Sequence, residues 1–148
     1  MALKERHFRQ LLETAAPLLL QDERVELTTL ATVGSVSVKR KALTAAAVGV
    51  ASMGTLIATA QPRPMYLILT DQRLLFFACL RPNNKTGKLL INVPRQYAGV
   101  GTAQKGMFGL TLVTSLFVAG AERGLTLTFP APCRPQGREL IAALPSAP

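Results

Sequence analysis

Two apolar runs separated by a short polar turn are the most clearly patterned stretch of the chain. Met65–Leu69 and Leu74–Leu80 are rich in leucine, aromatic and β-branched side chains. Thr70-Asp71-Gln72-Arg73 supplies the residue types of a tight turn between them. The pattern predicts a central β-hairpin from Arg63 to Leu80, around which the other elements pack.

Further strands are predicted on both sides of this hairpin. Apolar and polar residues alternate from Val25 to Val33, which is the pattern of a half-buried strand, and Gly34 ends or turns it. Val36 and Val38 continue the alternation and predict a second, paired strand. Later strands are predicted at Lys88 to Val93, Leu110 to Val118 and Leu125 to Phe129.

Helices are predicted at both ends of the chain. From Leu3 to about Ala16, apolar residues recur at helical spacing, until Pro17 interrupts the pattern. Gln136 to Leu144 has the same spacing and predicts a terminal helix that caps an open end of the sheet.

The stretch from Ala42 to Ala60 contains nineteen residues and no charge, and it follows directly on Lys39-Arg40-Lys41. Its length suits a membrane span, but seven residues are Ala, two are Gly and four are Ser or Thr, which contribute little transfer energy. The preferred interpretation is a helix packed on the sheet or on another subunit. A membrane-inserted or membrane-lying helix and a pair of strands are the alternatives. The residues expected to form the packing or membrane face are Leu43, Val48, Val50, Met53, Leu56 and Ile57.

The polar turn is predicted to be structural. Thr70 and Asp71 can hydrogen-bond to nearby backbone groups, and Asp71 is close enough to Arg73 for a pair that locks the turn. The alternative is that Arg73 contacts a ligand.

Charge is distributed unevenly along the chain. The whole protein carries 17 Lys and Arg against 8 Asp and Glu, a net charge of +9, whereas residues 1–26 alone hold four basic and five acidic residues. The excess of basic residues after residue 26 can attract the phosphates of lipid or nucleic acid. The alternative is that these charges serve only solubility. The candidate anion- or lipid-binding residues are Lys39, Arg40, Lys41, Arg81, Lys85 and Lys88. Nucleic acid is the least favoured partner, because aromatic residues make up only 5% of the chain and Trp is absent.

Chemistry-bearing motifs are hard to find. The single His7 has only Glu5 as an acidic neighbour, the acids after Glu26 are isolated from one another, and Cys79 and Cys133 are not in metal-ligand spacing. We therefore expect no catalysis, no metal and no cofactor. Two unpatterned cysteines and a charged, amphipathic N-terminus without a signal-peptide core predict a cytoplasmic protein, with the inner face of the membrane as an alternative place of work.

The order of elements resembles a known family. Leu67 to Phe77 places an apolar strand, Thr-Asp-Gln-Arg and a second apolar strand in an LT-x-x-R-LL arrangement, Pro94-Arg95 follows a further strand, and Gly124 to Phe129 precedes the last helix. In these features Glu23 to Leu144 resembles bacterial pleckstrin-homology-like (PH-like) and GRAM-like domains. The resemblance implies an α+β fold, mainly antiparallel, with a small barrel of about seven strands. It also implies that the loops at one open end form the contact surface, as in related eukaryotic domains that bind phosphoinositide headgroups, although no headgroup motif is recognisable here.

These observations predict one PH-like domain at 23–144, preceded by an N-terminal helix and connector at 1–22 and followed by a tail at 145–148. The uncharged helical insert at 42–60 departs from the minimal domain. The predicted function is a non-catalytic interaction or assembly module that binds a protein partner or a second copy of itself. The alternative is a peripheral membrane module that binds anionic lipid through a basic patch and the apolar insert.

Overall fold

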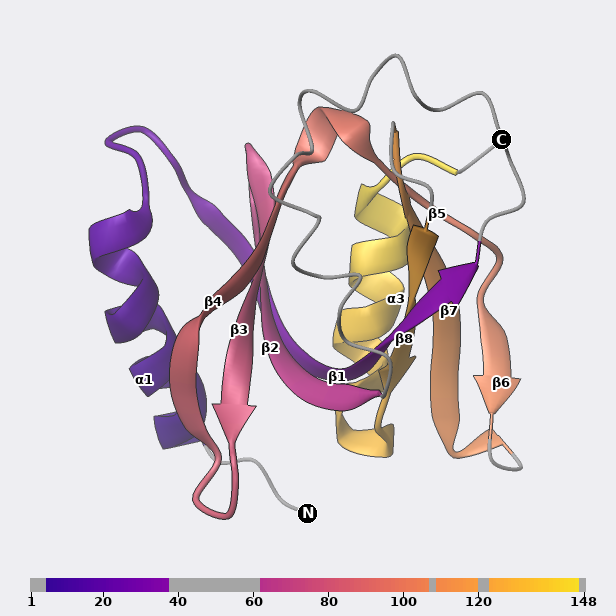
Figure 1. The fold of residues 1–148 in the computed structure, drawn as a ribbon, viewed down its shortest axis with the longest axis horizontal. Coiled ribbons are helices and arrows are strands. Elements are labelled where there is room, and N and C mark those ends of the chain that lie inside the picture. The colour runs from indigo at the N-terminus through magenta and orange to yellow at the C-terminus, as the bar shows by residue number, and fades with distance from the viewer. Residues whose placement is uncertain (1–4, 38–61, 107–108, 120–122, 147–148) are drawn as a thin grey trace.

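The computed structural model describes residues 5–37, 62–106, 109–119 and 123–146 (Figure 1). The elements in chain order are α1 (Glu5–Ala15), η1 (Ala16–Leu18), β1 (Val25–Ser37), β2 (Arg63–Thr70), β3 (Arg73–Leu80), β4 (Lys85–Pro94), η3 (Arg95–Tyr97), β5 (Ala98–Val100), β6 (Gln104–Gly106), β7 (Thr111–Val118), β8 (Arg123–Phe129), η5 (Ala131–Cys133) and α3 (Arg134–Ala143). The Ala/Gly-rich stretch at 42–60 and Lys39, Arg40 and Lys41 lie outside the described residues, so the predictions made for them stay predictions.

All strands in the described residues belong to one antiparallel sheet in the order β4-β3-β2-β1-β8-β7-β5, and β6 pairs with β7. The long strand β1 joins the two halves of this sheet. Its first part pairs with β2, from Val25 opposite Thr70 to Val33 opposite Arg63, and its last part pairs with β8 up to Ser37 opposite Arg123. The prediction of two short strands divided at Gly34 is therefore wrong. Gly34 sits inside β1 and has Pro62 packed over it, at 3.3 Å from the position of an added Cβ.

The interior of the curved sheet is a continuous apolar core. Side chains on one face of a strand alternate with those on the other, and the paired registers bring Leu67, Phe76, Leu127 and Leu116 to the inner face, where all are buried. In β7 the alternation is complete: Leu112, Thr114, Leu116 and Val118 are buried and the residues between them are partly exposed. One face of this half of the sheet is therefore core and the other borders solvent.

The half of the sheet formed by β2 and β3 is buried on both faces, because helix α1 covers its outer side. Tyr66 and Phe77 are paired on the outer face, and the ring of Phe8 meets Tyr66 edge to face with centroids 6.0 Å apart. Leu11 and Ala15 of α1 are fully buried in the same core cluster. Double-sided burial explains why both strands read as continuous apolar runs rather than as alternating patterns.

Helix α3 closes the other side of the molecule, where it contacts β1 and β7. Gly137 permits the close approach, since an added Cβ would lie 2.7 Å from the ring of Phe129 and 3.1 Å from Leu112. Leu140 of α3 and Leu144, the residue directly after the helix, are buried. The α+β class, the antiparallel sheet and both terminal helices agree with the sequence-based expectation.

Candidate functional site

The two ends of the β2–β3 hairpin are built from different chemistry. At one end, the upper end in Figure 1, lie the β2–β3 turn and η3. At the other lies the β3–β4 loop. The β3–β4 loop end carries Arg81, Lys85 and Lys88, which the sequence predicts as anion- or lipid-binding residues.

Exposed basic residues from β2, β4 and the β3–β4 loop lie at this end of the hairpin. Lys85 is paired with Leu80 across the hairpin, Lys88 follows in β4, and Arg81 begins the loop. Arg63 was not among the predicted site residues, yet antiparallel pairing of β2 with β3 returns the start of β2 to this same end. We call this surface the basic hairpin end: Arg63, Leu80, Arg81, Lys85 and Lys88, all of them exposed.

The sequence around Arg81, Lys85 and Lys88 contains no acidic residue. Between Gln72 and Ala121 the chain contains six Lys or Arg and no Asp or Glu. Leu80 is 48% exposed beside these bases. The basic hairpin end therefore presents positive charge around an apolar tip, which suits an acidic partner surface.

The loop itself is held from beneath by buried groups. The Tyr66 hydroxyl donates a hydrogen bond of 2.6 Å to the carbonyl oxygen of Asn84, and Asn84 is buried with a φ of 58°, in the left-handed region that Asn tolerates. Burial raises the pKa of Tyr66 above its usual value, so the hydroxyl stays protonated and remains a donor. Burial likewise raises the pKa of the Cys79 thiol, which makes it a poor nucleophile.

Close strand approach also shapes the tip. A Cβ added to Gly87 would lie 2.9 Å from the Cβ of Ala78 and 3.2 Å from Leu80, so only glycine lets β4 pass this close to β3. The basic side chains consequently project from a fixed backbone.

At the opposite end, the carboxylate of Glu23 holds the β2–β3 turn. It accepts hydrogen bonds from the Thr70 hydroxyl at 2.6 Å and from Arg73 Nε and Nη2 at 3.0 and 2.7 Å. It also accepts the Leu20 backbone N–H at 2.9 Å. Arg73 lowers the pKa of this buried carboxyl to about 2, so it is ionised across the physiological range.

The sequence predicted that Asp71 and Arg73 pair with each other to lock the turn, but in the structure each has another partner. Arg73 pairs with Glu23 and donates to the Leu18 carbonyl at 2.9 Å, whereas Asp71 Oδ1 accepts the backbone N–H of Arg24 at 3.0 Å. The turn is instead organised by Thr70, whose hydroxyl oxygen accepts the Arg73 N–H at 2.8 Å and the Gln72 N–H at 3.1 Å. The side chains of Thr70, Asp71 and Arg73 thus all contact the connector before β1, about fifty residues earlier in the sequence. Local sequence patterns do not reveal contacts over this separation.

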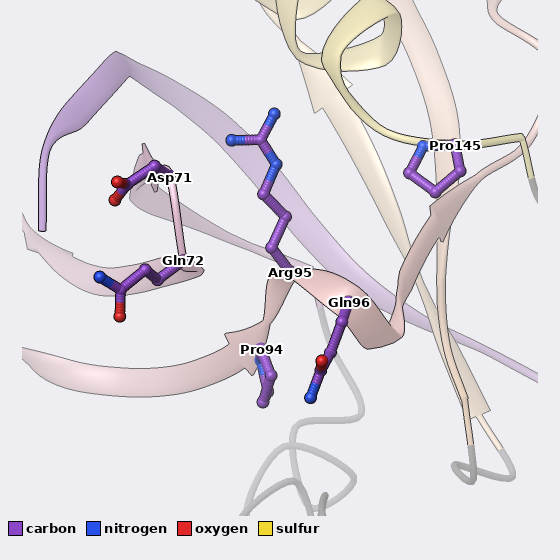
Figure 2. A pocket seen from close by; sticks show the side chains of 6 residues that line it. All are labelled: Asp71, Gln72, Pro94, Arg95, Gln96 and Pro145. Atoms are coloured by element: carbon purple, nitrogen blue, oxygen red, sulfur yellow. The ribbon is translucent and has the colours of Figure 1, made fainter.

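A shallow pocket of about 540 Å³ lies beside this turn, and Figure 2 shows its lining residues: Asp71, Gln72, Pro94, Arg95, Gln96 and Pro145. Arg95 Nη1 donates to Glu26 and to the Thr70 carbonyl at 2.8 and 2.9 Å, and Nη2 donates to the Ala143 carbonyl at 3.2 Å. The Arg95 guanidinium thus links β1, β2 and the end of α3. These bonds give Arg95 a structural task.

Within the part of the chain that the structure describes, no three His, Cys, Asp or Glu residues are placed to hold a metal ion. In the same part, no helix is long and apolar enough to cross a bilayer.

Comparison with known proteins bears on the fold. No protein-family model and no curated protein matches the chain. One solved structure that resembles this chain is that of Vav1 with an allosteric inhibitor, from work on Vav1 inhibitors that block GEF activity. It matches 94% of this chain with a TM-score of 0.52 and 14% sequence identity. Vav1 contains a PH domain. The fold is PH-like. The chain spans 33% of the Vav1 chain, and a likeness at this identity shows the fold alone.

Proposed function

We propose that this protein is a non-catalytic PH-like interaction module that contacts a protein partner through the basic hairpin end. The observation that supports this most is the exposed cluster of Arg81, Lys85 and Lys88 around Leu80, in the stretch from Gln72 to Ala121 that contains no acid, together with Arg63 at the start of β2. PH-like folds are generally modules for protein or lipid interaction. The turn end, by contrast, uses Arg73 and Arg95 to hold its own segments together.

Site-specific photocrosslinking in the native cell tests this proposal, because it captures a partner whose identity need not be assumed. A photoreactive residue at position 80 should give discrete protein adducts on irradiation, since an interface residue lies within contact distance of its partner. The same residue at Lys105 in β6 or Arg138 in α3, both exposed away from the loop, serves as the control. Absence of adducts at position 80, or equal adducts at all three positions, would count against the proposal.

An anionic membrane is the second candidate, and the exposed Leu80 between basic residues favours it. Each base near an anionic bilayer contributes about 1 kcal/mol, and an apolar tip adds burial in the interface. Co-sedimentation with vesicles that contain phosphatidylserine, compared with phosphatidylcholine alone, examines this candidate. It predicts binding that is lost in Leu80→Ser and in Lys85→Glu/Lys88→Glu. Equal sedimentation of the parent protein with both vesicle types would rule it out.

A further inference from the structure

A second exposed leucine surface lies on α1 and the connector that follows it. Leu12, Leu18 and Leu20 are 40%, 44% and 56% exposed. From Gln10 to Glu23 the chain contains three acids and no Lys or Arg, and of these Glu13 and Asp22 are exposed. We call Leu12, Glu13, Leu18, Leu20 and Asp22 the acidic leucine patch.

The backbone of this patch is fixed although its leucines face solvent. The Leu18 carbonyl accepts a hydrogen bond from Arg73, and the Leu20 N–H donates to the buried carboxylate of Glu23. The Glu23 N–H donates to the Leu20 carbonyl at 3.1 Å. A backbone that is already fixed loses little conformational entropy when a partner covers its side chains.

The two leucine surfaces carry opposite charge, and they lie at opposite ends of one molecule. Leu18 contacts Arg73 at the start of β3, and Leu80 ends that eight-residue strand. Seven steps of strand rise separate the two ends by about 23 Å. Figure 1 shows the end of α1 beside the upper end of the sheet and the β3–β4 loop at the lower end. The two surfaces therefore cannot meet within one copy.

We propose that the acidic leucine patch of one copy binds the basic hairpin end of a second copy, so that molecules associate head to tail. This inference rests on the proposed function and names its partner. Leu80 packs among Leu12, Leu18 and Leu20, while Lys85 and Lys88 lie against Glu13 and Asp22. A two-fold contact of either surface with itself would place like charges opposite each other, which disfavours that kind of dimer. Because the contact is heterologous, each added copy leaves both surface types available at the ends, and assembly continues past the dimer or closes into a ring.

Sedimentation velocity over a concentration series at low ionic strength tests the proposal. The unmodified chain should form species larger than dimers, and added salt should dissociate them because exposed charges are screened. A hairpin variant (Leu80→Ser, Lys85→Glu, Lys88→Glu) and a patch variant (Leu18→Ser, Leu20→Ser, Asp22→Lys) should each associate at least about tenfold more weakly. The control is Lys105→Glu/Arg138→Glu, which also reverses two charges and should assemble normally. Circular dichroism and thermal melting verify that all variants fold.

Mixing the two variants gives the decisive result. Each retains the surface that the other lacks, so an equimolar mixture should form a heterodimer and stop there. A monomeric parent protein at every concentration, a mixture that stays monomeric, or a variant that assembles as well as the parent would overturn the inference. Photocrosslinking from position 80 to a different protein would overturn it too, while leaving the proposed interaction module intact.

Discussion

The two ends of the β2–β3 hairpin use arginine and lysine for different purposes. At the turn end, Arg73 and Arg95 bind Glu23 and Glu26 and several carbonyl groups, so their charge stabilises the fold. At the basic hairpin end, the loop is stabilised from within by Tyr66 and Asn84, and the cationic side chains are exposed. An exposed basic residue therefore indicates a binding surface only where other groups already form the hydrogen bonds that hold the local fold.

This contrast predicts that removal of Glu23 has the largest effect on stability. Glu23→Ala leaves the guanidinium of Arg73 and the Thr70 hydroxyl without their buried partner, so the free energy of unfolding should fall by about 4 kcal/mol. Urea denaturation measures the change. Glu13→Ala, at an exposed acid of α1, is the control and should change stability by less than about 0.5 kcal/mol. Similar values for the two variants would mean that the turn end does not depend on Glu23.

Acid should weaken the turn end through the same carboxylate. The folded-state pKa of Glu23 is about 2, against an ordinary value of 4.5, so its stabilising contribution is complete above pH 4.5 and is lost as the pH falls towards 2. A difference of this size corresponds to about 3 kcal/mol. Denaturation curves recorded from about pH 6 down to about pH 2 should show this extra loss in the parent protein relative to Glu23→Gln. Parallel pH profiles for the two proteins would contradict the assignment.

A smaller loss is expected when the support beneath the basic hairpin end is removed. Tyr66→Phe deletes the donor to the buried Asn84 carbonyl and should lower the free energy of unfolding by about 1.5 kcal/mol. Hydrogen exchange should accelerate most in the loop from Arg81 to Lys85. Tyr97→Phe, at a partly buried tyrosine in η3, is the matched control and should leave that loop unchanged.

The smallest effect on stability is expected from the exposed bases themselves. Lys85→Glu/Lys88→Glu should shift the free energy of unfolding by less than about 0.5 kcal/mol, since both side chains are exposed and their removal leaves the buried support in place. Thermal unfolding provides the measurement. A loss of unfolding free energy as large as that of Tyr66→Phe would show that the exposed bases also stabilise the fold, which contradicts the proposed contrast between the two ends.

The sequence alone determined the elements whose signal is local. The apolar runs on either side of Thr70 to Arg73 marked the hairpin, and the spacing of Phe8, Leu11 and Ala15 marked α1, because periodicity reflects which side of an element is buried. The bases Arg81, Lys85 and Lys88 could be read as one cluster because they are neighbours in the chain.

Only the tertiary structure decided which distant groups meet. Arg73 lies fifty residues from Glu23 and Arg95 lies sixty-nine residues from Glu26, so neither pair leaves a trace in local spacing. The same holds for Arg63, which reaches the basic hairpin end through antiparallel pairing, and for β1, which continues through Gly34 because β2 and β8 pair with successive parts of it. Strand pairing and the packing of α1 select the partner of each charge, and this selection divides the hairpin into one end that holds the fold and one that remains open to a partner.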